Sequence, residues 1–239
     1  MSDPRSWPIV EVVDPSFTRG HHTIWACVDP DELWYVIRAK IIPDGAFGQI
    51  ATDIKAERGY LPHAPALAIM DQRGGAHVMN KETNESWFDR FAREGLRYVP
   101  STDVPMQALH DWLRPIYRPS QNRPIPKLRF TAQVAQMKEG PIWALERFIW
   151  SPDSTKMRQY KQKEKDFVDC LRYLAGYPGL SYQRLKGSVN ASAPSTLAAS
   201  YSRTTQSQSA SVGLRGLRTS QPRPSYRRTT SRRPAGGYW

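Results

Sequence analysis

Aspartates at three places in this 239-residue chain point to metal-dependent chemistry. Asp14 and Asp71 each close an apolar run that is typical of a strand. Asp166 and Asp169 lie one turn apart in a segment with helical periodicity. Converging carboxylates hold divalent cations, and oxygen ligands without nearby cysteine or histidine favour Mg²⁺ or Mn²⁺. Two such ions about 3.5 to 4 Å apart would promote hydrolysis of a phosphodiester.

The segments around the first two aspartates predict an α/β sheet. β-branched and aromatic residues indicate strands, and clusters of Asp, Pro and Gly separate them. Ile50 and Ile54 lie four residues apart with the charged Asp53 between them, which indicates a helix that packs by one face. The predicted order is a strand over 9–14, an antiparallel pair over 21–28 and 33–42, a helix over 47–60 and a buried strand over 65–71.

The predicted helix can return the chain so that the Asp71 strand lies parallel to the Asp14 strand. Both carboxylates would then sit at the carboxyl ends of neighbouring strands, where open α/β sheets place their sites. Adjacent strands are about 4.8 Å apart. Two carboxylates at this separation repel each other, so the arrangement favours a bound cation or a raised pKa.

A third acid is expected from the segment 163–175. Phe167, Leu171 and Leu174 are spaced four and three residues apart and predict the buried face of a helix. Asp166 and Asp169 lie on an adjoining face, and either of them can point at the strand ends.

These segments together resemble the C-terminal nuclease domain of tailed-phage large terminases, which has the RNase H-like fold. The resemblance covers about residues 7 to 176. The motifs that carry it are Val13 to Ser16, Ile69 to Gly75, Leu128 to Phe130, Pro141 to Trp150 and Lys165 to Tyr173.

The resemblance implies a two-metal endonuclease that cuts concatemeric double-stranded viral DNA during genome packaging. Asp14 would bridge two Mg²⁺ or Mn²⁺ ions, Asp71 would hold one of them, and Asp166 or Asp169 the other. Many members of the family have His-Asp-Asp where this chain has Glu-Lys-Asp, ending at Asp166. Alignment of that run favours Asp166 over Asp169 as the ligand. Lys127 is expected to contact DNA.

The chain contains no Gly-x-x-x-x-Gly-Lys-Ser/Thr sequence. We therefore expect a nuclease without the packaging ATPase, either as a split subunit or as a fragment. The resemblance implies a separate packaging ATPase, a small terminase and a portal as partners.

Composition changes near residue 177 and predicts two parts, a nuclease domain over 1–177 and a disordered basic tail over 178–239. From Cys170 onward there are eleven Lys and Arg and no acidic residue, so most of the net charge of +12 lies there. Polar residues dominate the tail, which therefore lacks the apolar surface that offsets ordering entropy. The arginines expected to contact DNA phosphates are Arg223, Arg227, Arg228, Arg232 and Arg233. A solubilising tail and docking on an acidic capsid component are the alternatives.

No run of eighteen apolar residues occurs, and the isolated Cys27 and Cys170 are typical of buried thiols in a reducing compartment. We therefore expect no membrane insertion and a location in the host cytoplasm. Two other functions stay open. One is an RNase H-like structure-specific nuclease such as a junction resolvase, and the other is a non-catalytic DNA or capsid adaptor.

Overall fold

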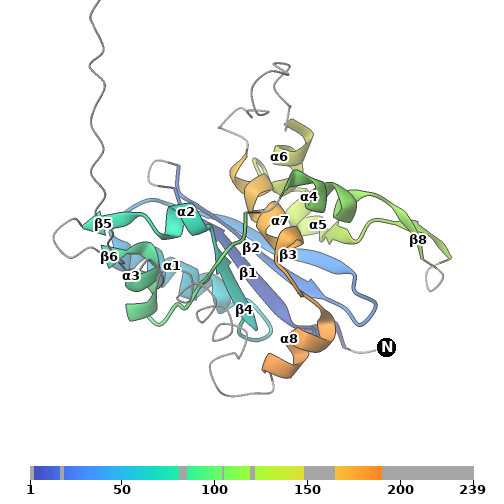
Figure 1. Cartoon of the computed structure of the whole chain (residues 1–239), viewed down its shortest axis with the longest axis horizontal. Helices are drawn as coiled ribbons and strands as arrows, with labels where there is room; N and C mark the ends of the chain where they lie inside the picture. Colours follow the sequence, from blue (N-terminus) through green and yellow to red (C-terminus); the bar gives the residue numbers. More distant parts are fainter. Residues whose placement is uncertain are drawn as a thin grey trace, which may run out of the picture.

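The computed structural model describes residues 3–16, 19–80, 85–103, 105–118, 122–147 and 165–189, and it contains a mixed sheet with helices on both faces (Figure 1). The six strands of this sheet run in the order β10-β3-β2-β1-β4-β7. Their bounds are Ile9–Asp14 for β1, His21–Val28 for β2, Trp34–Ile42 for β3, Leu67–Met70 for β4, Val99–Pro100 for β7 and Leu128–Phe130 for β10.

The directions of β1, β2, β3 and β4 agree with the sequence prediction. β1, β2 and β3 form an antiparallel meander, and β4 pairs parallel with β1 on its other side. β7 continues the parallel half beyond β4, while β10 pairs parallel with β3 at the opposite edge. All four residues of β4 are buried, as expected for a strand covered on both faces.

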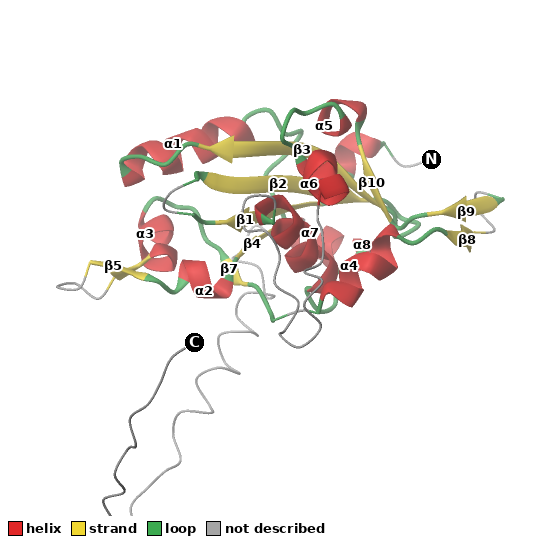
Figure 2. Cartoon of the chain, turned by 90° about the horizontal axis from the view of Figure 1, so that it is seen from above, coloured by secondary structure: helices red, strands yellow, loops and turns green. Residues whose placement is uncertain are grey.

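Helices and two small hairpins surround the sheet (Figure 2). No helix in the described ranges is both long and apolar enough to cross a bilayer. The helices are α1 (Phe47–Arg58), α2 (Gln72–Gly75), α3 (Trp87–Arg93), α4 (Met106–Leu113), α5 (Ala132–Ala135), α6 (Pro141–Arg147), α7 (Asp166–Gly176) and α8 (Tyr182–Val189), with a 3₁₀ turn at Pro4–Ser6. The hairpins are β5 (Val78–Asn80) with β6 (Glu85–Ser86), and β8 (Ile116–Arg118) with β9 (Arg123–Ile125).

Alternation along β1 divides the core into two layers. Val10 and Val12 belong to the cluster that includes the buried face of α7, whereas Val13 belongs to the cluster that includes α1 and α3. The apolar stripe predicted for the segment 163–175 is confirmed in α7, because Phe167 and Leu171 are buried in the first of these clusters. Side chains at even positions of β1 therefore face α7.

Glu11 occupies the opposite face of β1 and is fully buried. Its carboxylate accepts hydrogen bonds from Arg58 Nε at 2.7 Å and Nη2 at 2.8 Å, from Trp25 Nε1 at 2.7 Å and from the Tyr98 hydroxyl at 2.6 Å. A buried charge is tolerated only when it is paired and hydrogen-bonded. Glu11 therefore ties α1 and the segment before β7 to the centre of the sheet.

The fold continues beyond the predicted domain boundary at residue 177. Tyr182 and Leu185 of α8 are buried in the same cluster as α7, and the Tyr182 amide donates to Glu32 Oε1 at 2.8 Å. The prediction that disorder begins at residue 178 is therefore wrong for residues 178–189. The spacing of Tyr182, Leu185 and Val189 is helical, but the polar composition of the tail as a whole obscured it. Residues 190–239 lie outside the described ranges.

We predict that Leu185→Ala lowers the free energy of unfolding by about 2 to 5 kcal/mol, because it leaves a cavity under a fully buried side chain. Urea unfolding followed by circular dichroism would measure the change. Gln183→Ala, at an exposed position of the same helix, is the matched control and should change stability little. Equal effects of the two substitutions would show that α8 does not belong to the core.

Candidate metal centre

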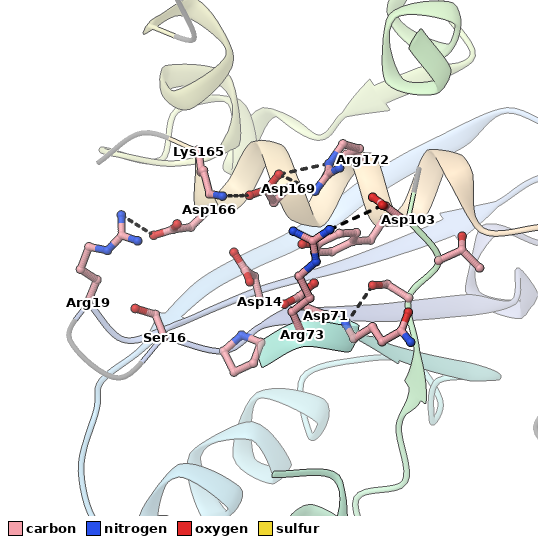
Figure 3. A pocket seen from close by; sticks show the side chains of 15 residues that line it. Asp14, Ser16, Arg19, Asp71, Arg73, Asp103, Lys165, Asp166, Asp169 and Arg172 are labelled. Carbon is pink, nitrogen blue, oxygen red and sulfur yellow. Dashed lines mark hydrogen bonds and ion pairs between the residues drawn. The ribbon is translucent and has the colours of Figure 1, made fainter. Parts of the chain in front are cut away.

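The parallel pairing of β1 and β4 brings Asp14 and Asp71 to the same edge of the sheet. Val13 is registered against Met70, and the Asp71 amide donates to the Val13 carbonyl at 3.0 Å. Asp14 is the last residue of β1 and Asp71 directly follows β4, and both continue the alternation of Val12 and Ile69, whose side chains lie in the α7 layer. Both carboxylates therefore lie on the side of the sheet that α7 covers (Figure 3).

Local hydrogen bonds hold the Asp71 carboxylate in place. Its Oδ2 accepts from the Gly74 amide at 2.6 Å and so caps the short helix α2. The Tyr173 hydroxyl of α7 also hydrogen-bonds to Asp71. A Cβ at residue 74 would lie 2.8 Å from Pro15 Cγ and 3.1 Å from Asp71 Oδ2, so glycine is required for this close approach.

The two aspartates of α7 are buried and are paired with cations. Asp169 Oδ2 lies 3.1 Å from Lys165 Nζ, and its Oδ1 lies 3.0 Å from Arg172 Nη2. Asp166 Oδ2 lies 3.1 Å from Arg19 Nη1. The side-chain exposures of Asp166 and Asp169 are only 4% and 3%, so each needs a counter-charge.

All four predicted aspartates line one cavity of about 450 Å³. In Figure 3, Asp14 lies between Asp71 on one side and the two acids of α7 on the other. Burial raises the pKa of Asp14 well above its ordinary value, and the negative charges of Asp169, Asp71 and Asp166 raise it further, in that order of size. The cavity thus holds a carboxyl group that resists ionisation until a cation is supplied.

Asp166 has a different environment from Asp14. Burial raises its pKa, and Asp169 adds to the rise, whereas Arg19 and Lys165 oppose it. His22 Nδ1 lies 3.6 Å from Asp166 Oδ2, but burial lowers the pKa of this histidine to about 4. His22 is therefore neutral at pH 7, and Arg19 supplies the positive charge beside Asp166.

The donor set suits a hard divalent cation. The four acids offer only carboxylate oxygens. The buried Asp166 Oδ2 accepts no hydrogen bond, although Arg19 Nη1 lies 3.1 Å away. No three acidic, histidine or cysteine side chains in the described ranges already converge into a complete ligand set. Asp14, Asp71 and the acids of α7 are the residues that would hold the metal.

Of the other predicted site residues, only Lys127 lies in the described ranges, and it lies outside the acid cluster. Lys127 does not line the cavity; its ammonium lies 4.5 Å from the centre of the Trp112 ring, and Lys127 is half-buried. The five tail arginines are outside the described residues. Sequence reasoning gave no role to Arg19, Lys165 or Arg172, which are the counter-charges of the acids. For Lys165 and Arg172 the sequence does offer a signal, because they lie four residues before and three residues after Asp169, which is the spacing of ion pairs on a helix.

The fold and the cavity together define the class of domain. An antiparallel meander, a parallel extension beyond its first strand and acids at the strand ends form an RNase H-like arrangement, as the sequence predicted. No protein-family model matches the chain, and no curated protein matches it significantly.

Solved structures of phage large terminases share this fold. The large terminase of a thermophilic bacteriophage, in complex with ATP-gamma-S, has 9% sequence identity and a TM-score of 0.55 over 75% of this chain and 42% of its own. Another crystal form of that terminase gives 9% identity and a TM-score of 0.52 over 73% and 41%. The P22 large terminase nuclease domain has 14% identity and a TM-score of 0.49 over 72% and 82%.

The resemblance predicted from the sequence is therefore confirmed at the level of fold. The chain spans about two fifths of the length of the thermophilic phage terminase.

The raised pKa of Asp14 predicts how metal-free stability depends on pH. In the unfolded chain Asp14 loses its proton at about pH 3.9, whereas in the folded protein it keeps the proton to higher pH. As pH rises from the unfolded pKa toward the folded pKa, the folded protein therefore loses stability. Asp14→Asn removes the titration. In chelator, the variant should gain stability relative to the parent by at most about 1.4 kcal/mol per pH unit across this window.

Thermal or urea unfolding of both proteins between pH 5 and about 8 would measure this difference. His21 and His22, each with a pKa lowered to about 4 by burial, destabilise both proteins equally at the acid end, and their effect cancels. If the stability difference between Asp14→Asn and the parent protein did not change with pH, the raised pKa of Asp14 would be contradicted.

Proposed function

We propose that this chain is a metal-dependent endodeoxyribonuclease, acting as the nuclease part of a phage terminase large subunit. One observation carries the proposal: aspartates from β1, β4 and α7 meet in a single cavity at the carboxyl ends of two parallel strands. The fold shared with phage large terminases gives independent support.

Asp14, Asp71 and Asp169 are the proposed principal metal ligands, and Asp166 is a further ligand at the edge of the site. Alignment alone favoured Asp166 over Asp169. The electrostatics favour Asp169, because its charge contributes more than that of Asp166 to raising the pKa of Asp14. Asp166 instead lies toward Arg19, away from Asp71 (Figure 3).

Two Mg²⁺ or Mn²⁺ ions at these carboxylates would activate water and stabilise the leaving oxygen of a DNA phosphodiester. The protein's own residues hold the carboxylates in place. Tyr173 and the Gly74 amide hold the Asp71 carboxylate in one orientation. Asp14 is carried by the central strand of the sheet, so its position is set by pairing on both sides. No protein nucleophile is required.

The proposed substrate is double-stranded viral DNA cut during genome packaging. The chain lacks a phosphate-binding loop sequence, so the packaging ATPase would be a separate polypeptide or region. A small terminase and a portal are the further partners that this role requires. The tail arginines, from Arg223 to Arg233, are a proposed second contact with DNA.

A non-catalytic adaptor is the second candidate. The observation that favours it is that the described acids do not already form a complete ligand set. The adaptor would bind DNA or a capsid component with no response to divalent metal. Titration of the purified protein with Mn²⁺ by calorimetry separates the two, since only the nuclease requires a binding isotherm.

We predict that the protein nicks or cuts plasmid DNA in Mg²⁺ or Mn²⁺ and is inactive in chelator. Asp14→Asn and Asp71→Asn should each lower the cleavage rate by more than about 100-fold, since losing even an outer partner of a metal ligand costs about 10- to 100-fold. Both variants should remain folded, because each substitution removes one repelling charge.

Asp111→Asn is the matched control for this cleavage assay. Asp111 is exposed on α4 and accepts a hydrogen bond from Gln107 away from the cavity. Its substitution should leave cleavage unchanged. Full activity of either Asp14→Asn or Asp71→Asn would refute the metal assignment.

A second comparison identifies the ligand on α7. Asp169→Asn should lower cleavage more than Asp166→Asn, since Asp169 interacts more strongly with Asp14. Single-turnover cleavage across a Mn²⁺ titration would separate loss of metal affinity from loss of rate. The reverse order, with Asp166→Asn the more damaging, would restore the assignment made from sequence alignment.

A further inference from the structure

The cavity contains basic side chains, and three of them are paired with the acids of α7. Arg19 pairs with Asp166 at 3.1 Å, while Lys165 and Arg172 pair with Asp169 at 3.1 and 3.0 Å. A metal ion that binds the same carboxylate oxygens must compete with these pairs. Metal binding therefore cannot leave the basic side chains in the positions that they occupy in the metal-free protein.

The three basic side chains can reach the open part of the cavity. Arg19, Lys165 and Arg172 all line it, with side-chain exposures of 33%, 32% and 17%. The two acids are buried and need a counter-charge, which a divalent ion with direct carboxylate contacts supplies. Such an ion can therefore displace the basic side chains.

The sign of the charge in the cavity depends on metal. Five acidic and four basic side chains line it, which gives a formal charge of −1, or of zero while Asp14 keeps its proton. Two divalent ions, with all five acids ionised, would change this to +3. A DNA phosphate would gain no attraction in the first state and would be attracted in the second. The same ions that complete the acidic site would thus displace the basic groups from the acids of α7 and make the cavity positive.

We propose that Arg19, Lys165 and Arg172 form a phosphate-binding site for the DNA backbone that is available only after metal displaces them from Asp166 and Asp169. This inference rests on the proposed function and assigns DNA contacts to residues of the cavity itself. Metal and DNA therefore bind with positive coupling, and each raises the affinity for the other.

Two other basic residues show why the assignment is selective. Arg58 is held by two hydrogen bonds to the buried Glu11 on the opposite face of the sheet and does not line the cavity. Arg73 lines the cavity, but its partner Asp103 is 83% exposed and lies outside the acid cluster. Metal binding at Asp169 would release neither of them.

Lys165→Met provides the test, because it should have effects of opposite sign on two ligands. Without DNA, Mn²⁺ should bind the variant about two- to fivefold more tightly by calorimetry, since a competing cation is gone. With Ca²⁺ present, the variant should bind a short fluorescein-labelled duplex more weakly. The slope of log affinity against log salt should fall by about 0.9, the value for one lost phosphate contact.

The chelator measurement shows whether the contact depends on metal. In chelator, the DNA affinity and salt slope of Lys165→Met should equal those of the parent protein. Lys165→Arg should keep the slope in Ca²⁺, and Arg19→Met should reproduce the loss. The matched control is Lys55→Met on α1. It breaks a 3.6 Å surface pair with Glu94 and should change the binding of neither Mn²⁺ nor DNA.

Other results would overturn the proposal in distinguishable ways. An equal loss of DNA affinity in Ca²⁺ and in chelator would show a phosphate contact that does not depend on metal. An unchanged slope in both would show no contact. Weaker Mn²⁺ binding by Lys165→Met would mean that Lys165 positions Asp169 for the metal. Failure of the parent protein to bind Mn²⁺ would contradict the proposed function itself, and this inference with it.

Discussion

The parallel pairing of β1 with β4 is the constraint on which the site depends. Two residues that are 57 positions apart in sequence, Asp14 and Asp71, become neighbours because Val13 is registered against Met70. A shift of one residue in this register would turn one carboxylate to the α1 face and separate the pair. The buried strand β4 cannot slip in this way without moving its wholly apolar sequence out of the core.

The acid cluster makes the site costly in the metal-free protein, and the chain reduces that cost in two ways. Asp14 takes up a proton more readily than usual, and the acids of α7 are paired with Arg19, Lys165 and Arg172. Both arrangements are reversible, since a proton or an ammonium group can leave when a divalent cation arrives. A site that was neutralised permanently would have no remaining affinity for metal.

The sequence was sufficient to predict the meander, the return helix, the buried strand β4 and the acids at the strand ends. These features follow from short-range periodicity and from the geometry of parallel strands. It did not predict α8, whose three apolar residues are diluted by a polar neighbourhood, or the partnership of Arg19 with Asp166. An ion pair between a strand connection and a late helix depends on tertiary packing. No local pattern encodes it.

Glu11 shows how the sheet separates electrostatic environments. It lies three residues before Asp14 on the same strand, yet the charges that raise the pKa of Asp14 come from the other acids of the cavity. The Glu11 charge is neutralised on the opposite face by Arg58. Because Glu11 and Arg58 form an ion pair with no net charge, they act across the sheet only as a dipole, whereas the opposite face carries exchangeable charge. Loss of Arg58 alone would turn that dipole into an unpaired negative charge three residues from Asp14.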